Sequence, residues 1–246
     1  MRIQVLTPQH SEHLLSYLAR TTIANRLPSL SAFYLKCGVN EQCKGFSLND
    51  FDNQRSTLDR IADWIGVDYE LLTDLIPAHD GEHCHYLGME LPPNVIQFDR
   101  VRCCPQCLQE RGKIAAYYAL RPVSMCLRHR TSLAETWLDG SIIEWGDNDL
   151  YERICDGECA VHDISWEQEE LSIHLGRLLK GQYTKTLARE FGIMDAANFL
   201  TLLSFSFNNS YRHPEVSDNE FWADCYQVLQ HSPLNLFEFV EVLNGA

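Results

Sequence analysis

Four side chains in the middle of the chain have the residue types and the spacing of a metal site. They form two pairs, Cys104-x2-Cys107 and Cys126-x2-His129, with eighteen residues between the pairs. A two-residue gap folds into a tight turn that directs both side chains to one point, and Pro105 stiffens the first turn. Two such turns can surround zinc tetrahedrally with three thiolates and one imidazole. The alternative is that these residues are unrelated buried thiols.

Four protein ligands leave no position on the zinc ion for a water molecule. Without that water the metal cannot activate a nucleophile, so the sequence predicts a structural site with three cysteines and one histidine. The free energy of metal binding would then stabilise a segment that could not otherwise form a core. The two-residue spacing favours Cys104 over its neighbour Cys103 as the first ligand, and Cys103 remains the alternative.

A second group, Cys155-x3-Cys159-x2-His162, could supply three ligands to another zinc ion. Its fourth ligand would be Cys103 or one of His83, Cys84 and His85, and the alternative is free thiols on a solvated loop. Ten cysteines in a chain without signs of export favour metal binding over a disulfide framework. No role is assigned to the isolated cysteines, because such residues are usually small buried hydrophobes: Cys37, Cys43, Cys84 and Cys225.

The net charge of −14 is distributed unevenly along the sequence. Residues 100–130 hold seven Lys and Arg against one acid, whereas residues 131–170 hold twelve acids against one Arg. A protein that binds DNA over a broad surface needs many cations to match the phosphates. The balance therefore favours a protein partner, or a nucleoprotein contacted through a small basic face. The candidate backbone contacts, whose alternative role is simple solvation, are Arg100, Arg102, Arg111, Lys113, Arg121, Arg128 and Arg130.

Helices are expected on both sides of this central segment. Residues 11–26 have apolar residues at helical spacing, with Ser11 available as the N-cap, and a second helix from Ser29 to Cys37 would end at Gly38. Residues 56–76 form two apolar runs broken at Gly66, with Asp68 placed to cap the second run. This pattern is typical of a helix-turn-helix, although any helical hairpin with a glycine turn would look similar.

A similar pattern recurs in residues 183–203, around Ala188-x3-Gly192-Ile193. The second helix of neither unit contains Lys or Arg, so we expect no sequence-specific base reading by either one. Residues 77–98 contain three prolines and little periodicity, which indicates a linker. We therefore predict a mainly α fold: a helix-turn-helix-like domain at 1–98, a zinc-binding module at 99–165, and a helical domain at 166–246 with the second helix-turn-helix-like unit.

Several other classes of protein are disfavoured by the sequence. No apolar stretch approaches the roughly 20 residues of a membrane helix, and the start becomes polar too soon for a signal peptide, so a cytoplasmic location is expected. There is no Gly-rich phosphate loop, no Gly-x-Ser-x-Gly elbow and no His-Glu-x-x-His motif. We therefore expect no enzymatic activity.

The run from Cys103 to Leu133 resembles the zinc motif of the TniQ/TnsD family, in which Cys-Pro-x-Cys-Leu, a spacer, Cys-x-x-His and a following Leu recur. The opening of the chain, with Pro8, Glu12, Leu15, Ser16, Leu18 and Arg20, resembles the start of the family. The resemblance gives the ligand positions to Cys104, Cys107, Cys126 and His129. The chain departs from the family where Tyr117 and Tyr118 replace a spacer Trp, and where Cys155 and Cys159 stand for a Cys-rich pair that usually follows the Leu sooner.

The resemblance implies a non-catalytic adaptor that chooses where a transposon inserts. Such adaptors couple a target-recognition complex to an AAA+ ATPase of the TnsC type, which recruits the transposase. Some members read an attachment site in DNA themselves, and others dock as a homodimer on an RNA-guided Cascade complex with its guide RNA. The acidic balance favours the second mode, with target DNA touched indirectly or weakly. The alternatives are an autonomous DNA-binding selector and an unrelated zinc-containing regulatory scaffold.

Overall fold

The fold is described by a computed structural model for residues 4–9, 11–39, 51–73, 75–79, 84–98, 100–147, 149–180, 196–209 and 217–231. In these residues helices predominate and the strands are only two or three residues long. The predicted mainly α class is therefore confirmed. None of the helices described is long and apolar enough to cross a membrane.

Two short helices open the fold, α1 (Leu14–Ala24) and α2 (Leu30–Lys36). The N-cap of α1 is His13, whose Nδ1 accepts the backbone N–H of Leu15 at 3.2 Å. The predicted cap at Ser11 is wrong, because Ser11 adopts a left-handed backbone with φ 56° outside the helix. Helix α2 begins after Ser29 and ends before Gly38, as the sequence predicts.

The predicted helical hairpin around Gly66 is present. Helix α3 (Phe51–Ile65) is followed by Gly66, whose φ of 77° closes the turn. The N–H of Gly66 donates to Ala62 O at 2.7 Å. Helix α4 (Tyr69–Thr73) follows but has only five residues, so it is roughly 7.5 Å long. The predicted second turn around Gly192 lies outside the described residues.

The described part of residues 77–98 contains a small sheet where a linker was predicted, so that prediction is wrong. Strands β1 (Ala78–His79), β2 (Cys84–Tyr86) and β3 (Met89–Leu91) are antiparallel, with Cys84 opposite Leu91 and Tyr86 opposite Met89. The two residues between β2 and β3, Leu87 and Gly88, both have positive φ, which suits a two-residue hairpin turn. A 3₁₀ turn, η1 (Pro93–Val95), follows the sheet.

Three longer helices pack against one another in the C-terminal part: α7 (Trp166–Leu179), α9 (Ala196–Asn209) and α10 (Asp218–His231). Helix α7 begins where the sequence predicts, because Ser165 and Gln168 form a reciprocal capping box. Helix α9 also contacts β3 and η1, and Ser204 donates a hydrogen bond to Asn94 at 2.6 Å.

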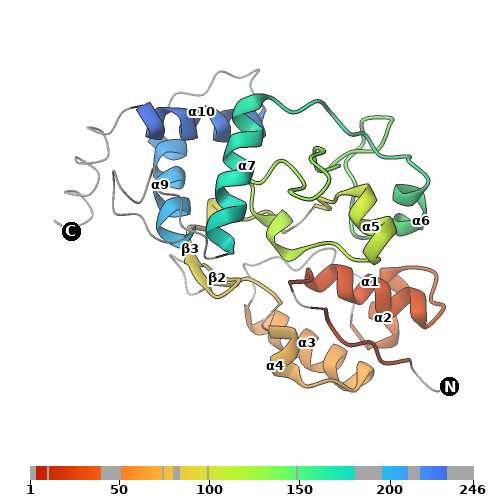
Figure 1. Ribbon diagram of the computed structural model, residues 1–246. Helices are drawn as coiled ribbons and strands as arrows, with labels where there is room; N and C mark the ends of the chain where they lie inside the picture. The colour runs from red at the N-terminus through yellow and green to blue at the C-terminus, as the bar shows by residue number, and fades with distance from the viewer. Residues whose placement is uncertain are drawn as a thin grey trace.

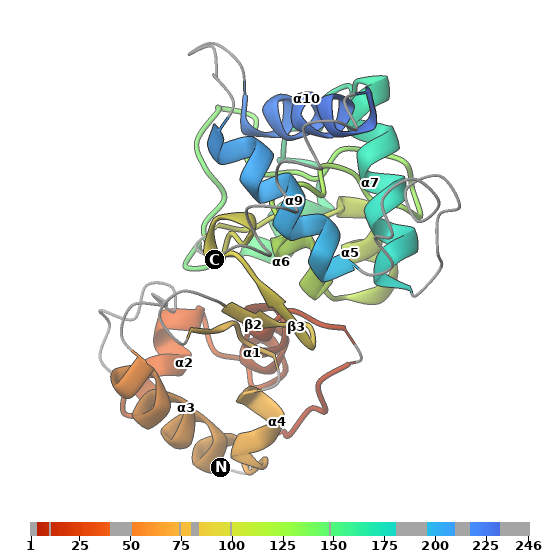
Figure 2. The same ribbon diagram turned by 90° about the vertical axis from the view of Figure 1, so that its left-hand side faces the viewer.

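The central segment contains short elements, α5 (Pro105–Arg111), η2 (Ala116–Ala119) and α6 (Leu150–Cys155). Helices α1–α4 lie together on one side of the molecule, and α7, α9 and α10 lie on the other side with α5 and α6 (Figure 1). The turned view shows β2 and β3 at the boundary between the two sides (Figure 2). Ser16 of α1 is tied to the central segment, because its Oγ accepts from Ile114 N–H at 2.9 Å and from Tyr151 Oη at 2.8 Å. The domain limits near 98 and 165 stay predictions.

Candidate metal centre

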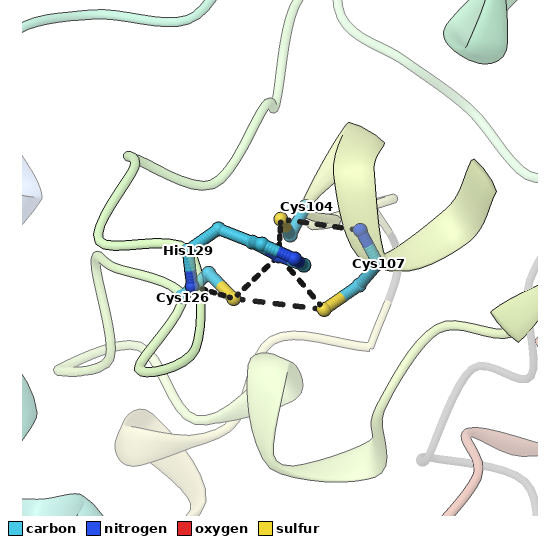
Figure 3. A group of neighbouring side chains, drawn as sticks. All are labelled: Cys104, Cys107, Cys126 and His129. Atoms are coloured by element: carbon cyan, nitrogen blue, oxygen red, sulfur yellow. Dashed lines mark hydrogen bonds between the residues drawn. The ribbon is translucent and has the colours of Figure 1, made fainter. Parts of the chain in front are cut away.

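The two predicted half-sites converge on one point. The ligand atoms of Cys104, Cys107, Cys126 and His129 all lie within 4.8 Å of one another (Figure 3). Nδ1 of His129 lies 3.3, 3.4 and 3.6 Å from the sulfurs of Cys104, Cys107 and Cys126, respectively. The sulfurs of Cys107 and Cys126 are 3.6 Å apart. These four side chains could therefore hold a metal ion.

The spacing of the four atoms fits a tetrahedral ion. Zinc bonds of ~2.3 Å to sulfur and ~2.0 Å to nitrogen imply tetrahedron edges of about 3.8 Å between sulfurs and about 3.5 Å between sulfur and nitrogen. The three nitrogen–sulfur distances and the distance between the sulfurs of Cys107 and Cys126 lie within a few tenths of an ångström of these values, and the two sulfur–sulfur distances to Cys104 lie within 4.8 Å. Three thiolates and an imidazole are ligands that zinc accepts, whereas calcium and magnesium prefer oxygen.

The first half-site is formed by the start of α5. Cys104 is the N-cap of this helix, Pro105 occupies the first helical position, and the N–H of Cys107 donates to Cys104 Sγ at 3.4 Å. Proline is favoured there because its fixed φ suits the helix and its missing N–H costs no hydrogen bond. Sequence reasoning left Cys103 as an alternative ligand, but its sulfur is not part of the converging group.

The second half-site is a reverse turn after Cys126. The N–H of His129 donates to Cys126 Sγ at 3.4 Å, so this turn repeats the hydrogen-bond pattern of the first one. The turn is closed from both ends, because Cys126 N–H donates to Thr131 O at 2.9 Å and Arg130 N–H donates to Cys126 O at 2.8 Å. Arg130 has φ 54°, the left-handed conformation that this turn needs.

Two further side chains position the ligands. The Tyr118 hydroxyl donates to Cys126 Sγ at 3.2 Å, and Oε1 of Glu110 lies 3.2 Å from Nε2 of His129. A carboxylate on Nε2 fixes the imidazole so that Nδ1 faces the sulfurs. Sequence reasoning missed both roles. The available signal for Glu110 was its position three residues after Cys107 on the same helix, which places both on one face.

The protein environment makes the thiols unequal. The pKa of Cys126 is lowered, because its sulfur accepts hydrogen bonds from the Cys104 thiol first, then from the Tyr118 hydroxyl and two backbone N–H groups. The pKa of Cys104 is raised, because its proton is engaged with Cys126 and because burial disfavours the thiolate. Cys126 is therefore the thiol that this environment holds most readily as a thiolate.

The second predicted group is not assembled. Among the residues that the structure describes, the converging candidate ligands are those of the first site. Cys155 and His162 are exposed, whereas the buried Cys103 and Cys159 lie in separate bridges with Ala134 and Trp137. Of the other proposed ligands, Cys84 is buried in β2, the neighbouring His85 is exposed, and His83 lies outside the described residues. The described residues therefore do not assemble a second set of ligands, and the second zinc site stays a prediction.

Arg102 does not belong to an accessible basic face, and this part of the nucleic-acid prediction is corrected. The residue is 3% exposed, and its guanidinium donates to the carbonyls of Tyr118, Leu120 and Val123 at 2.7–3.0 Å. It also pairs with Glu135 at 2.8 Å. A charge so enclosed stabilises the loops around the metal centre and offers no group to a phosphate.

Three of the six remaining predicted cations lie next to carboxylates that the structure describes. Arg128 pairs with Glu110 at 2.8 Å, Arg121 with Asp218 at 3.4 Å, and Arg130 with Glu169 at 3.6 Å. Arg100 and Arg111 are exposed, and Lys113 is partly buried, which lowers its pKa. The segment rich in Lys and Arg is therefore a weaker positive surface than its composition indicates.

The start of the chain, which resembles the start of the TniQ/TnsD family, contains a buried ion pair. Glu12 is fully buried and receives two hydrogen bonds of 2.6 Å from the guanidinium of Arg20. Gln9 N–H and Ser16 Oγ donate to the same carboxylate at 2.9 and 3.2 Å. Because Ser16 also binds the central segment, this network connects the start of the chain to the neighbourhood of the metal centre.

Comparison with known families agrees with this arrangement. A family model described as TniQ matches residues 4–133, a stretch that includes the Glu12–Arg20 pair, the hairpin around Gly66 and all four residues of the metal centre. No curated protein matched the sequence. The matched residues make up more than half of the 246-residue chain. The chain therefore belongs to the TniQ family, which acts in the selection of target sites for DNA transposition.

Proposed function

We propose that the chain is a non-catalytic adaptor that links an RNA-guided Cascade complex at target DNA to an AAA+ ATPase of the TnsC type, and through it to the transposase. In this proposal the adaptor acts in the cytoplasm as a homodimer and meets DNA only through its partners. Membership of the TniQ family supports a role in target selection. The docking mode is inferred from the charges of the chain.

The observation that carries the proposal is the neutralisation of the basic segment. Four of its seven cations form ion pairs within the protein: Arg102, Arg121, Arg128 and Arg130. Affinity for DNA comes mainly from cations that replace counterions at the phosphates, so paired cations contribute little. The acidic residues 131–170, by contrast, contain one Arg, and that Arg153 pairs with Glu158 at 2.6 Å. This distribution favours contact with basic proteins.

The second candidate, an autonomous DNA-binding selector, would depend on the hairpin of α3 and α4. Helix α4 is five residues long, contains Glu70 and carries no Lys or Arg. Reading of guanine in the major groove usually requires Arg or Lys, so α4 is poorly suited to it. The third candidate, an unrelated zinc scaffold, is disfavoured by the family match.

We propose zinc as the ion of the metal centre. With Cys104, Cys107, Cys126 and His129 all bound to it, zinc would cross-link the two turns. It would have no open position for a reacting water molecule. The metal would join two turns that lie about twenty residues apart in the sequence, and so it would stabilise the fold of the central segment. The four ligands are the residues that hold it, and Glu110 and Tyr118 orient them.

The test is retention by the partner complexes. The tagged chain is immobilised, and the Cascade complex with guide RNA and the ATPase with ATP are added separately and in both orders. We expect both to be retained, and retention of neither in any order would contradict the proposal. Cys107→Ser should lose both partners with the folded centre, whereas Cys155→Ser, an exposed cysteine outside the centre, should retain them.

A gel shift distinguishes the second candidate. The chain alone is mixed with a random duplex and an attachment-site duplex at about 0.15 M salt, where weak electrostatic binding is screened. We expect no specific shift. A shift confined to the attachment site would favour the autonomous selector over the adaptor.

A further inference from the structure

A large groove lies beside the metal-site loop, the turn from Cys126 to His129, which contributes Leu127 and Arg128 to its lining. It has a volume of about 1150 Å³ and is lined by the β2–β3 turn, the end of α5, the loop after Cys126, the end of α7 and the start of α9. Most pockets for small molecules have volumes of roughly 300–1,000 Å³. The groove is therefore large enough for a segment of polypeptide.

The groove collects positive charge in an acidic protein. Among the described residues of its lining are three cations, Arg111, Arg128 and Lys180, and one carboxylate, Glu90. Arg111 and Lys180 are exposed, and the Arg128 side chain is 50% exposed although it pairs with Glu110. The described N-terminal turn of α9, which contributes Ala196 to Asn198, adds the partial positive charge of a helix start. The chain as a whole has a net charge of −14, so this concentration of cations is local.

Aliphatic side chains form the rest of the lining. Leu87 and Met89 come from the hairpin, Leu127 from the metal-site loop, and Leu178 from α7. Leu127 packs directly on Gly176 of α7, where an added Cβ would lie 2.0 Å from Leu127 Cδ1. Because Gly176 has no side chain, the Leu127 side chain of the metal-site loop can pack against the backbone of α7.

From this combination we infer that the groove binds an acidic amphipathic segment of a partner protein. Leucine-like side chains of the segment would contact the aliphatic lining, and its carboxylates would contact Arg111 and Lys180, since Arg128 already pairs with Glu110. Single-stranded nucleic acid is a poorer fit, because it requires aromatic platforms, and Tyr117 is the one aromatic residue among the described residues of the lining. The inference goes beyond the proposed function, since it does not depend on Cascade or on the ATPase.

Binding of a model peptide tests the inference on the full chain. The probe is a fluorescein-labelled peptide of about 16 residues, with Leu at positions i, i+3, i+4 and i+7 and Glu at the exposed positions. A second peptide has Lys in place of every Glu. Fluorescence anisotropy is measured with the wild-type chain, with the double variant Arg111→Glu/Lys180→Glu, and with Lys36→Glu/Arg177→Glu. The last pair reverses two exposed charges that do not line the groove.

We expect the acidic peptide to bind the wild type and the control variant equally, and to bind Arg111→Glu/Lys180→Glu at least about tenfold more weakly. The lysine peptide should show the reverse preference, binding the groove variant better than the wild type. Circular dichroism and a melting curve show that each variant is folded. Failure of the acidic peptide to bind the wild type, or equal binding to both variants, would overturn the inference. So would displacement of the peptide by oligo-dT at a lower concentration than by unlabelled peptide, which would assign the groove to nucleic acid.

Discussion

The hydroxyl of Tyr118 donates a hydrogen bond of 3.2 Å to the sulfur of Cys126, and its oxygen lies 3.7 Å from the sulfur of Cys107. One buried side chain from the spacer thus contacts a ligand from each half-site. Such a bond stabilises negative charge on the sulfur and holds it in place. The spacer therefore contributes to the metal centre as well as connecting its two halves.

Tyr118→Phe should weaken zinc binding without unfolding the chain. The phenyl ring keeps the packing, but the O–H···S bond is lost, and loss of such outer contacts costs about 10- to 100-fold in metal affinity. Competition with a chromophoric chelator measures the change. Tyr117→Phe is the matched control, because its ring contacts Tyr118 whereas the tyrosine hydroxyl that donates to the ligand sulfurs, among the described residues, is that of Tyr118. Equal affinity of the wild type and Tyr118→Phe would show that the bond is unimportant.

Glu12→Gln should destabilise the fold by about 3 kcal/mol, because it leaves the guanidinium of Arg20 partly buried without its anion. The ion pair raises the pKa of Arg20, but a guanidinium is protonated at neutral pH even without a partner, so this arginine stays charged in the variant. Urea denaturation measures the loss. In the background of Arg20→Met the same substitution should cost clearly less, since the two residues act on each other. Additive effects of the two substitutions would contradict this account.

Gly176→Ala should lower stability by about 1 kcal/mol, although alanine normally favours a helix over glycine by a similar amount. The reason is the contact with Leu127, whose Cδ1 would lie 2.0 Å from the new Cβ and must move. In the background of Leu127→Ala the effect should change sign, and Gly176→Ala should then raise stability. Thermal denaturation of the four proteins checks this. A stabilising Gly176→Ala in the wild-type background would show that Leu127 moves at no cost.

His13 should make the fold sensitive to acid. The ring is buried between Phe98 and Trp145, at centroid distances of 4.3 and 4.8 Å, and burial lowers its pKa from 6.5 to about 3. Below pH 6.5 the unfolded chain binds a proton that the folded chain does not. The stability is therefore complete above pH 6.5 and falls by about 1.4 kcal/mol per pH unit as the pH decreases toward 3.

Substitution of His13 by Asn isolates this contribution, because Asn keeps a hydrogen-bond acceptor for the N–H of Leu15. Between pH 7 and pH 5 the wild type should lose about 2 kcal/mol more than His13→Asn in urea denaturation. His174, whose pKa burial lowers to about 4, is unchanged in both proteins and cancels in the comparison. The same pH dependence in both proteins would show that His13 does not remain neutral.

The metal centre could be predicted because each half-site is local. Cys104 and Cys107, and likewise Cys126 and His129, are three residues apart and are closed by one N–H···S bond, so spacing alone describes them. The glycine-turn hairpin around Gly66 was predictable for the same reason. Elements whose geometry depends on a few neighbouring residues can be recognised from the sequence alone.

The errors concern features decided by distant contacts. Arg102 was expected at the surface, but its carbonyl partners lie 16 to 21 residues away in loops whose path the sequence does not reveal. The second cysteine group does not converge among the described residues, because its buried and exposed members lie in different strand bridges and at a helix end. The hairpin of β2 and β3 was missed because strands of three residues give almost no periodicity.

The metal content of the purified wild-type chain is the most direct test that the four ligands bind one zinc ion. The chain is expressed in zinc-supplemented medium, freed of loosely bound metal, and analysed by inductively coupled plasma mass spectrometry with a matched Cys155→Ser control. We expect one zinc ion per chain in the wild type and in the Cys155→Ser control. The double variant Cys107→Ser/Cys126→Ser should contain no zinc and should lose the native melting transition. A folded wild-type chain that contains no zinc, or a double variant that melts like the wild type, would contradict this prediction.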